Sequence, residues 1–141
     1  MESYLEKLSA FYSNLKIDGI PETVMDKAKL SLLDYLFVYV VGFHKGTLTQ
    51  AILDYIKHKR KNFESSIMLT GMKADTELAA FASGLIAHSV ELDDGHRFGT
   101  AHPAAVVIPA ALAEVEKQNA TLGKLLKAIV IGYDVMLRLS K

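Results

Sequence analysis

The segment from Pro21 to about Gly42 limits the possible folds of this chain more than any other part of the sequence. Pro21 suits the first turn of a helix, because its missing N–H would be unpaired there. The run LSLLDYLFVYVVGF (30–43) then places apolar residues on every side of that helix, which is typical of a helix at the centre of a core. The run is too short to span a bilayer and contains Asp34. We therefore expect this helix to be central to a globular protein.

Apolar periodicity predicts five more helices, joined by short connections. Capping boxes of Ser3 with Glu6 and of Thr47 with Gln50 mark two of their starts. The sequence thus predicts an all-α fold, a helical bundle of about six helices that forms a single domain over residues 1–141. The other helices are expected to begin at Asp75 or Thr76, at Pro103 and at Thr121, and SSIMLTG (65–71) is expected to be a short edge strand or a buried loop.

Composition excludes several classes of protein. Lys+Arg and Asp+Glu both total 16, so the chain lacks the basic field that nucleic acid or an anionic membrane requires. The chain has no cysteine, which excludes a disulfide, a thiolate nucleophile and a cysteine-ligated iron–sulfur cluster. The start, MESYLEKLSAFYSNLK, lacks the basic and apolar regions of a secretory signal. We expect a cytoplasmic protein, with neither nucleic acid nor membrane as a partner, that self-associates because half of its residues are hydrophobic.

The stretch HSVELDDGHRFGTAHP (88–103) concentrates the titratable groups of the chain. Seven of its sixteen residues can carry charge, and it holds three of the five histidines. A helix that begins at Pro103 points its free N–H groups back toward this loop, where the helix dipole favours a carboxylate or phosphate. His102 lies at the mouth of that expected anion site, and Arg97 is placed to make a second contact with the anion.

Acidic residues accompany the histidines of this stretch. Glu91, Asp93 and Asp94 can orient His96 and His102 or hold their protons, since a carboxylate beside an imidazole favours the charged ring. A histidine that titrates near neutrality beside an anion pocket suits proton transfer at a carbon next to a carboxylate. The stretch therefore predicts an acid–base enzyme that acts on a small organic acid.

A metal site is the first alternative for the same stretch. His88 and Glu91 are three residues apart, so they share one face if the helix continues that far. Asp94, His96 and His102 could complete an octahedral or facial set of ligands. Such a set would make this a metal-binding protein.

The second alternative is structural, a loop held together by internal salt bridges. Asp93 would then serve mainly as a cap that accepts backbone N–H groups. His88, at the end of an apolar helix, would be a core histidine with satisfied hydrogen bonds rather than a functional group.

Three runs of the sequence carry a resemblance to a known family: ELAAFASGLIAHSVELDDGHR, HPAAVVIPAALAEVE and LLKAIVIGYDVMLRL. Their most specific parts are H-x-x-[DE]-x-D-D-x-H followed by H-P-x-x-x-V-x-P. Together they resemble the N-terminal part of the MmgE/PrpD family, which includes 2-methylcitrate dehydratase, cis-aconitate decarboxylase and iminodisuccinate epimerase. The resemblance extends from the IPETVMDKAKLSLLDYL helix to the last residue.

The resemblance implies an all-α domain, usually homodimeric, with a cofactor-free lyase-type site for di- and tricarboxylic acids such as 2-methylcitrate. It implies that His102 is an active-site histidine and that Glu91 occupies the acidic position opposite it. It places Asp94 and His96 nearby as catalytic or supporting groups. Asp93 and the anion contact Arg97 are then expected to bind the substrate.

Length is the main departure from the family. Its members are several times longer, add an α/β domain, and draw a histidine, a lysine and a tyrosine from later regions. The final amphipathic helix also runs to within four residues of Lys141 without a glycine stop. We therefore expect activity only with further polypeptide, for example a separately encoded C-terminal half. The alternative is a non-catalytic remnant or assembly module that keeps the fold and oligomerises.

Overall fold

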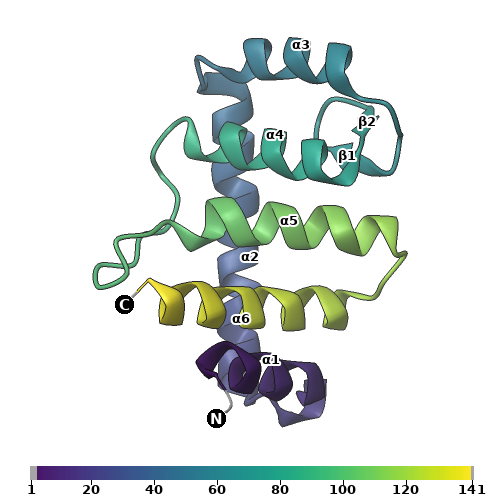
Figure 1. The fold of residues 1–141 in the computed structure, drawn as a ribbon. Coiled ribbons are helices and arrows are strands. Elements are labelled where there is room, and N and C mark those ends of the chain that lie inside the picture. The colour runs from purple at the N-terminus through teal and green to yellow at the C-terminus, as the bar shows by residue number, and fades with distance from the viewer. Residues whose placement is uncertain (1–2, 141) are drawn as a thin grey trace.

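The computed structural model describes residues 3–140, which contain six α-helices and one short hairpin (Figure 1). The all-α class and the number of helices that periodicity predicts are confirmed. The elements are α1 (Tyr4–Asn14), a 3₁₀ turn (Ile17–Gly19), α2 (Glu22–Lys45), α3 (Thr49–Lys59), β1 (Ser65–Ile67), β2 (Met72–Ala74), α4 (Thr76–His88), α5 (Pro103–Lys117) and α6 (Leu122–Leu139).

Helices α3, α4, α5 and α6 lie side by side in one layer, and α2 crosses behind them (Figure 1). The core lies where α2 meets this layer, because apolar side chains from both sides are removed from water there. The largest fully buried side chains include Tyr35, Val38 and Tyr39 of α2, Ile86 of α4, Ile108 of α5 and Ile129 of α6.

Helix α2 contributes to the core as expected, but only one of its sides is covered. One side of α2 packs against α4, α5 and α6, and Tyr35 and Val38 on that side are buried. Leu33 and Phe37 on the other side are exposed. The periodicity correctly indicates an apolar helix but does not reveal how many of its sides are covered by this chain.

Two of the four expected side-chain caps are present. Glu6 donates its backbone N–H to Ser3 Oγ at 3.2 Å and accepts the backbone N–H of Ser3 at 2.6 Å, so the capping box exists. Thr121 caps α6. The capping box expected of Thr47 with Gln50 is wrong, because α3 begins at Thr49 after Leu48, which has no capping side chain. At α4 the N-cap residue Asp75 makes no side-chain cap and instead accepts the backbone N–H groups of Lys61 and Asn62.

The expected edge strand at residues 65–71 is confirmed for its first part, β1. It pairs in antiparallel register with β2, so that Ser65 lies opposite Ala74 and Ile67 opposite Met72.

Among residues 3–140, no helix by itself is both long enough and apolar enough to cross a membrane. The pair α2 and α3 passes the same test when taken together, but the two helices are bent by 95° relative to each other.

Helices α4 and α5 approach each other closely at Gly84. A Cβ atom at this position would lie 2.5 Å from the backbone oxygen of Ala105, which is closer than van der Waals contact allows. Gly84 therefore permits the two backbones to pack together. The consequence for the site is that the last residue of α4, His88, lies beside the first turn of α5.

Candidate functional site

The loop from Ser89 to His102 joins α4 to α5, and a histidine stands at each of its ends. His88 is the last residue of α4, and His102 is the N-cap residue of α5. The centroids of the two rings are 5.1 Å apart. Both rings are therefore held on two helices that pack against each other, rather than on the loop itself.

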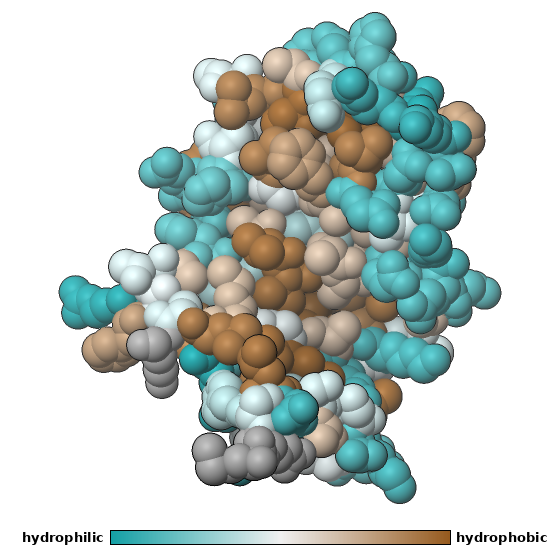
Figure 2. Space-filling model, in the orientation of Figure 1, coloured by the Kyte–Doolittle hydropathy of each residue, from teal (hydrophilic) through white to brown (hydrophobic). Residues whose placement is uncertain are grey.

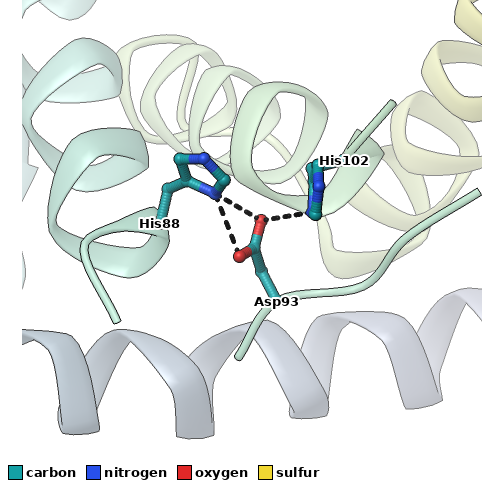
Figure 3. A group of neighbouring side chains, drawn as sticks. All are labelled: His88, Asp93 and His102. Atoms are coloured by element: carbon teal, nitrogen blue, oxygen red, sulfur yellow. Dashed lines mark hydrogen bonds and ion pairs between the residues drawn. The ribbon is translucent and has the colours of Figure 1, made fainter. Parts of the chain in front are cut away.

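Asp93 lies between these two rings (Figure 3). Both of its carboxylate oxygens are 3.0 Å from Nδ1 of His88, and Oδ2 is 3.4 Å from Nδ1 of His102. The side chain of Asp93 is 0% exposed, whereas those of His88 and His102 are 45% and 51% exposed. We call these three residues the His–Asp–His cluster. A carboxylate that holds Nδ1 orients an imidazole and leaves its Nε2 for another partner.

Asp94 has different partners from its neighbour Asp93. It accepts the backbone N–H of Ala104 at 2.9 Å and the hydroxyl of Tyr133 at 2.9 Å. Burial raises the pKa of Tyr133, and the negative charge of Asp94 raises it further, so this hydroxyl stays a donor. The sequence predicted that the first turn of α5 binds the carboxylate or phosphate of a ligand. In the structure, the carboxylate of Asp94 accepts a backbone N–H of this turn. The cap role considered for Asp93 is performed by Asp94.

His96 takes part in the structure of its own loop. Its backbone N–H donates to Ala101 O at 2.8 Å, and its Nδ1 accepts the backbone N–H of Gly99 at 3.0 Å. This small loop extends from one edge of the helix layer (Figure 1). Arg97 is exposed. The contacts of His96 indicate a supporting role in the loop, and the functional roles of His96 and Arg97 stay predictions.

Glu91 lies at the surface, in a turn directly after α4. Its φ of 49° is in the left-handed region, and its backbone N–H donates to His88 O at 3.0 Å. The carboxylate that contacts His102 belongs to Asp93. The catalytic role that the resemblance implies for Glu91 stays a prediction.

His88 was considered from the sequence as a metal ligand but was given no part in the predicted acid–base site. Its ring is exposed and contacts Asp93, so the interpretation as a core histidine is wrong. Its position supplied a signal, because a histidine that ends an apolar helix beside an acidic loop lies at the border between core and solvent. A helical pattern alone does not indicate on which side of that border the ring falls.

A groove of about 370 Å³ opens beside the cluster. Apolar side chains of α4, α5 and α6 line it, including Phe81, Val106 and Met136, and His88 and His102 lie at one end. Figure 2 shows apolar side chains gathered over the middle of this face of the molecule. The groove therefore offers an apolar wall that leads to a polar, titratable end, which is common in ligand sites.

The same cluster could hold a metal ion. His88, Asp93 and His102 each offer one ligand atom, and these atoms lie within 4.8 Å of one another. Two imidazoles and one carboxylate form a recognised set for divalent transition metals. The sequence analysis considered five metal ligands, and two of them, His88 and His102, belong to this cluster. The carboxylate comes from Asp93, which was not among the five.

The structure is an all-α domain with the His–Asp–His cluster at one edge of a helix layer. The family described as the MmgE/PrpD N-terminal domain matches residues 6–141. The chain belongs to the MmgE/PrpD family, as its motifs predicted, and corresponds to the N-terminal domain of that family.

Characterised relatives support this assignment. The chain is 29% identical over 133 residues to the cis-aconitate decarboxylase-like protein oryM of Aspergillus oryzae, a match over 94% of this chain and 27% of that protein. It is 27% identical over 137 residues to cis-aconitate decarboxylase of Aspergillus terreus and 28% identical over 149 residues to that of Mus musculus. These matches cover 92% and 99% of this chain but 27% and 29% of the relatives. The chain thus spans little more than a quarter of the length of these relatives.

Proposed function

We propose that this chain supplies the histidine–carboxylate part of an acid–base site for a small di- or tricarboxylic acid. The reaction class is the dehydration, isomerisation or decarboxylation of such an acid, which makes the complete enzyme a lyase or an isomerase. The observation that carries the proposal is the His–Asp–His cluster at the end of the groove. Membership of the MmgE/PrpD family and the likeness to cis-aconitate decarboxylases support the choice of substrate class.

The cluster divides the chemistry between its three members. His102 exchanges a proton with the carbon next to a substrate carboxylate, as a general acid or base. Asp93 holds Nδ1 of His102 and stabilises the ring when it carries the extra proton. His88, in its protonated form, attracts a second carboxylate of the substrate. Since the Asp93 carboxylate is buried and both rings are exposed, the substrate meets the imidazoles and not the acid behind them.

Further polypeptide completes this site. The relatives are more than three times as long as their matched segments, and the groove beside the cluster is open at the surface formed by α4, α5 and α6. A second segment laid over this face would exclude water and add groups that bind the remaining carboxylates. It could come from the same gene or from a separately encoded chain.

Calorimetric titration with cis-aconitate tests the proposal. We expect the chain to bind the acid and His102→Asn or Asp93→Asn to weaken binding by about tenfold or more, because a charge-assisted hydrogen bond is lost. His58→Asn is the matched control, since this exposed histidine lies on α3, away from the cluster. Equal binding by the wild type and His102→Asn would refute the proposed site. Rapid turnover by the chain alone would refute the need for further polypeptide.

A metal-binding function is the second candidate, favoured by the three ligand atoms that lie within 4.8 Å. Titration with Co²⁺ separates the two functions, because a Co²⁺ ion held by protein ligands acquires a visible absorption spectrum. The metal function predicts stoichiometric binding that His88→Ala abolishes and His58→Ala preserves. Spectra unchanged by the protein would remove this candidate. A chain that binds neither the acid nor the metal would fit the non-catalytic assembly module.

A further inference from the structure

A second cavity, of about 460 Å³, lies between α1, α2 and α6, at the end of the molecule where α1 runs beside α6 (Figure 1). We call it the α1 cavity. Met136 of α6 lines the groove beside the His–Asp–His cluster, whereas its neighbour Leu137 lines the α1 cavity. Among the described residues, none lines both hollows. The α1 cavity is therefore a separate place for a ligand, and its volume falls within the roughly 300–1,000 Å³ usual for small-molecule sites.

The walls of the α1 cavity are mainly apolar. The three helices contribute apolar side chains that include Phe11, Leu15, Val24, Ala28, Val130 and Leu137. Phe11 and Val24 are still 61% and 39% exposed, so the chain leaves apolar area at this cavity in contact with water. A ligand with an apolar body would remove that area from water, which is the main driving force for such binding.

Two charged residues line the α1 cavity, and the negative one is compensated within the protein. Asp134 accepts the hydroxyl of Tyr12 and forms an ion pair with Arg138 at 2.9 Å. This carboxylate therefore already has a counter-charge on its own helix. The other charged residue, Lys27, decides which sign of charge the cavity prefers in a ligand.

Lys27 is exposed on α2. Among residues 3–140, its ammonium group forms no hydrogen bond or ion pair, whereas the nearby Lys29 is paired with Asp26 at 2.8 Å. Ser31 lies one helical turn after Lys27 and also lines the cavity, and its hydroxyl is a second donor. An ammonium group and a hydroxyl beside apolar walls suit a ligand that has a carboxylate on an apolar body.

We propose that the α1 cavity binds a monocarboxylic acid with a medium-length alkyl chain, such as octanoate or decanoate. The alkyl chain lies against the apolar walls, and the carboxylate accepts hydrogen bonds from Lys27 and Ser31. A group of the size of a water molecule occupies roughly 30 Å³, so the cavity holds about 15 such groups, enough for decanoate. Polycarboxylates such as cis-aconitate carry more than one charge and lack an alkyl chain, so the α1 cavity and the His–Asp–His cluster take different acids.

Calorimetric titration with octanoate and decanoate, both below the concentrations at which they form micelles, tests the apolar part of the proposal. Each acid should saturate a single site per chain. Decanoate should bind roughly tenfold more tightly than octanoate, because it buries two more methylene groups. A large excess of cis-aconitate should not compete. Binding that does not saturate, or equal affinities for the two acids, would overturn the proposal.

A pair of lysine variants tests the carboxylate contact. Lys27→Gln should weaken octanoate binding by roughly five- to tenfold, because a charge-assisted hydrogen bond is lost, and should leave the binding of octan-1-ol unchanged. Lys29→Gln is the matched control, since it removes the same charge from the same helix outside the cavity. Both positions are exposed, and circular dichroism checks that each variant keeps its helices. Equal losses in the two variants, or no loss in Lys27→Gln, would overturn the role of Lys27.

A methyl NMR spectrum locates the bound acid. Decanoate should shift the methyl signals of Ile129, Val130 and Leu137, which line the α1 cavity. The signals of Val106 and Met136, which line the groove, should stay in place. Shifts confined to the two groove residues would overturn the proposal. Because the two hollows share no described lining residue, this result does not depend on whether the His–Asp–His cluster binds a polycarboxylate.

Discussion

Asp93 and Asp94 are adjacent in sequence, but their carboxylates contact different groups. The backbone directs Asp93 between two exposed imidazoles and directs Asp94 to a backbone N–H and a tyrosine hydroxyl. The first arrangement suits proton transfer, because its imidazoles reach solvent. The second fixes the start of α5 and so the position of His102. Asp93 is thus the carboxylate of the proposed site, and Asp94 is the carboxylate that positions His102.

Removing the positioning carboxylate should destabilise the fold. Asp94→Ala deletes the acceptor for Ala104 N–H and for the Tyr133 hydroxyl, so we expect a loss of about 2–3 kcal/mol in the free energy of unfolding. Urea denaturation measures it. Asp26→Ala, which removes a surface pair with Lys29, is the control and should cost under about 1 kcal/mol. Equal losses would contradict the role given to Asp94.

Buried tyrosines make stability depend on alkaline pH. Burial raises the pKa of Tyr39 from 10.0 to about 12, and its hydroxyl donates to Met68 O at 2.9 Å. The protonated form is favoured in the folded state, so this contribution is complete below pH 10 and is lost as pH rises toward 12. Two pKa units correspond to about 2–3 kcal/mol.

The test is urea denaturation between pH 9 and 12, the range set by this pKa. The wild type should lose stability more steeply with rising pH than Tyr39→Phe, which cannot ionise at this position. Tyr4→Phe is the control, because Tyr4 is exposed, and it should follow the wild type. Identical slopes for the wild type and Tyr39→Phe would contradict the effect of burial on this tyrosine.

At the scale of elements, the contact between α4 and α5 sets the geometry of the cluster. These helices carry His88 and His102 at adjacent ends, and Gly84 allows the backbones to approach. A change that separates the helices would therefore move the two imidazoles apart without touching either.

Gly84→Ala should separate them. The new methyl group would meet Ala105 O at 2.5 Å, so we expect a loss of about 1–3 kcal/mol in the free energy of unfolding together with weaker binding of cis-aconitate. Gly123→Ala is the matched control in α6, where an added Cβ finds its nearest neighbour at 3.6 Å. It should be neutral or stabilising, since alanine favours helices. A fully stable Gly84→Ala would contradict the close approach.

The sequence predicts most helices here, because apolar periodicity and capping residues are local properties. The start of α3 differs because Thr49 is drawn into the helix and donates its hydroxyl to Gly42 O at 3.0 Å, a contact between two helices. The stretch 88–103, singled out for its titratable residues, contains all three members of the His–Asp–His cluster. The sequence allowed Glu91, Asp93 or Asp94 to contact His102, and in the structure Asp93 does so. The choice among the three depends on the path of the loop, which has left-handed backbone at Glu91 and Thr100, and periodicity carries no information about such turns.

At the scale of the whole molecule, two faces of one helix layer have different properties. One face carries the groove with the cluster at its end. The other is crossed by α2, whose outer side exposes Leu33 and Phe37. The proposed acid-binding site uses only the first of these faces.

The most direct test of the central claim is an NMR titration of the histidine side chains with cis-aconitate. The chain has five histidines, which give separate signals in a long-range ¹H–¹⁵N spectrum. We predict that His88 and His102 shift together with one saturable dissociation constant, while the exposed His44 and His58 stay in place. Five histidines that shift uniformly, or cluster signals that do not move, would contradict a carboxylic-acid site at His88, Asp93 and His102.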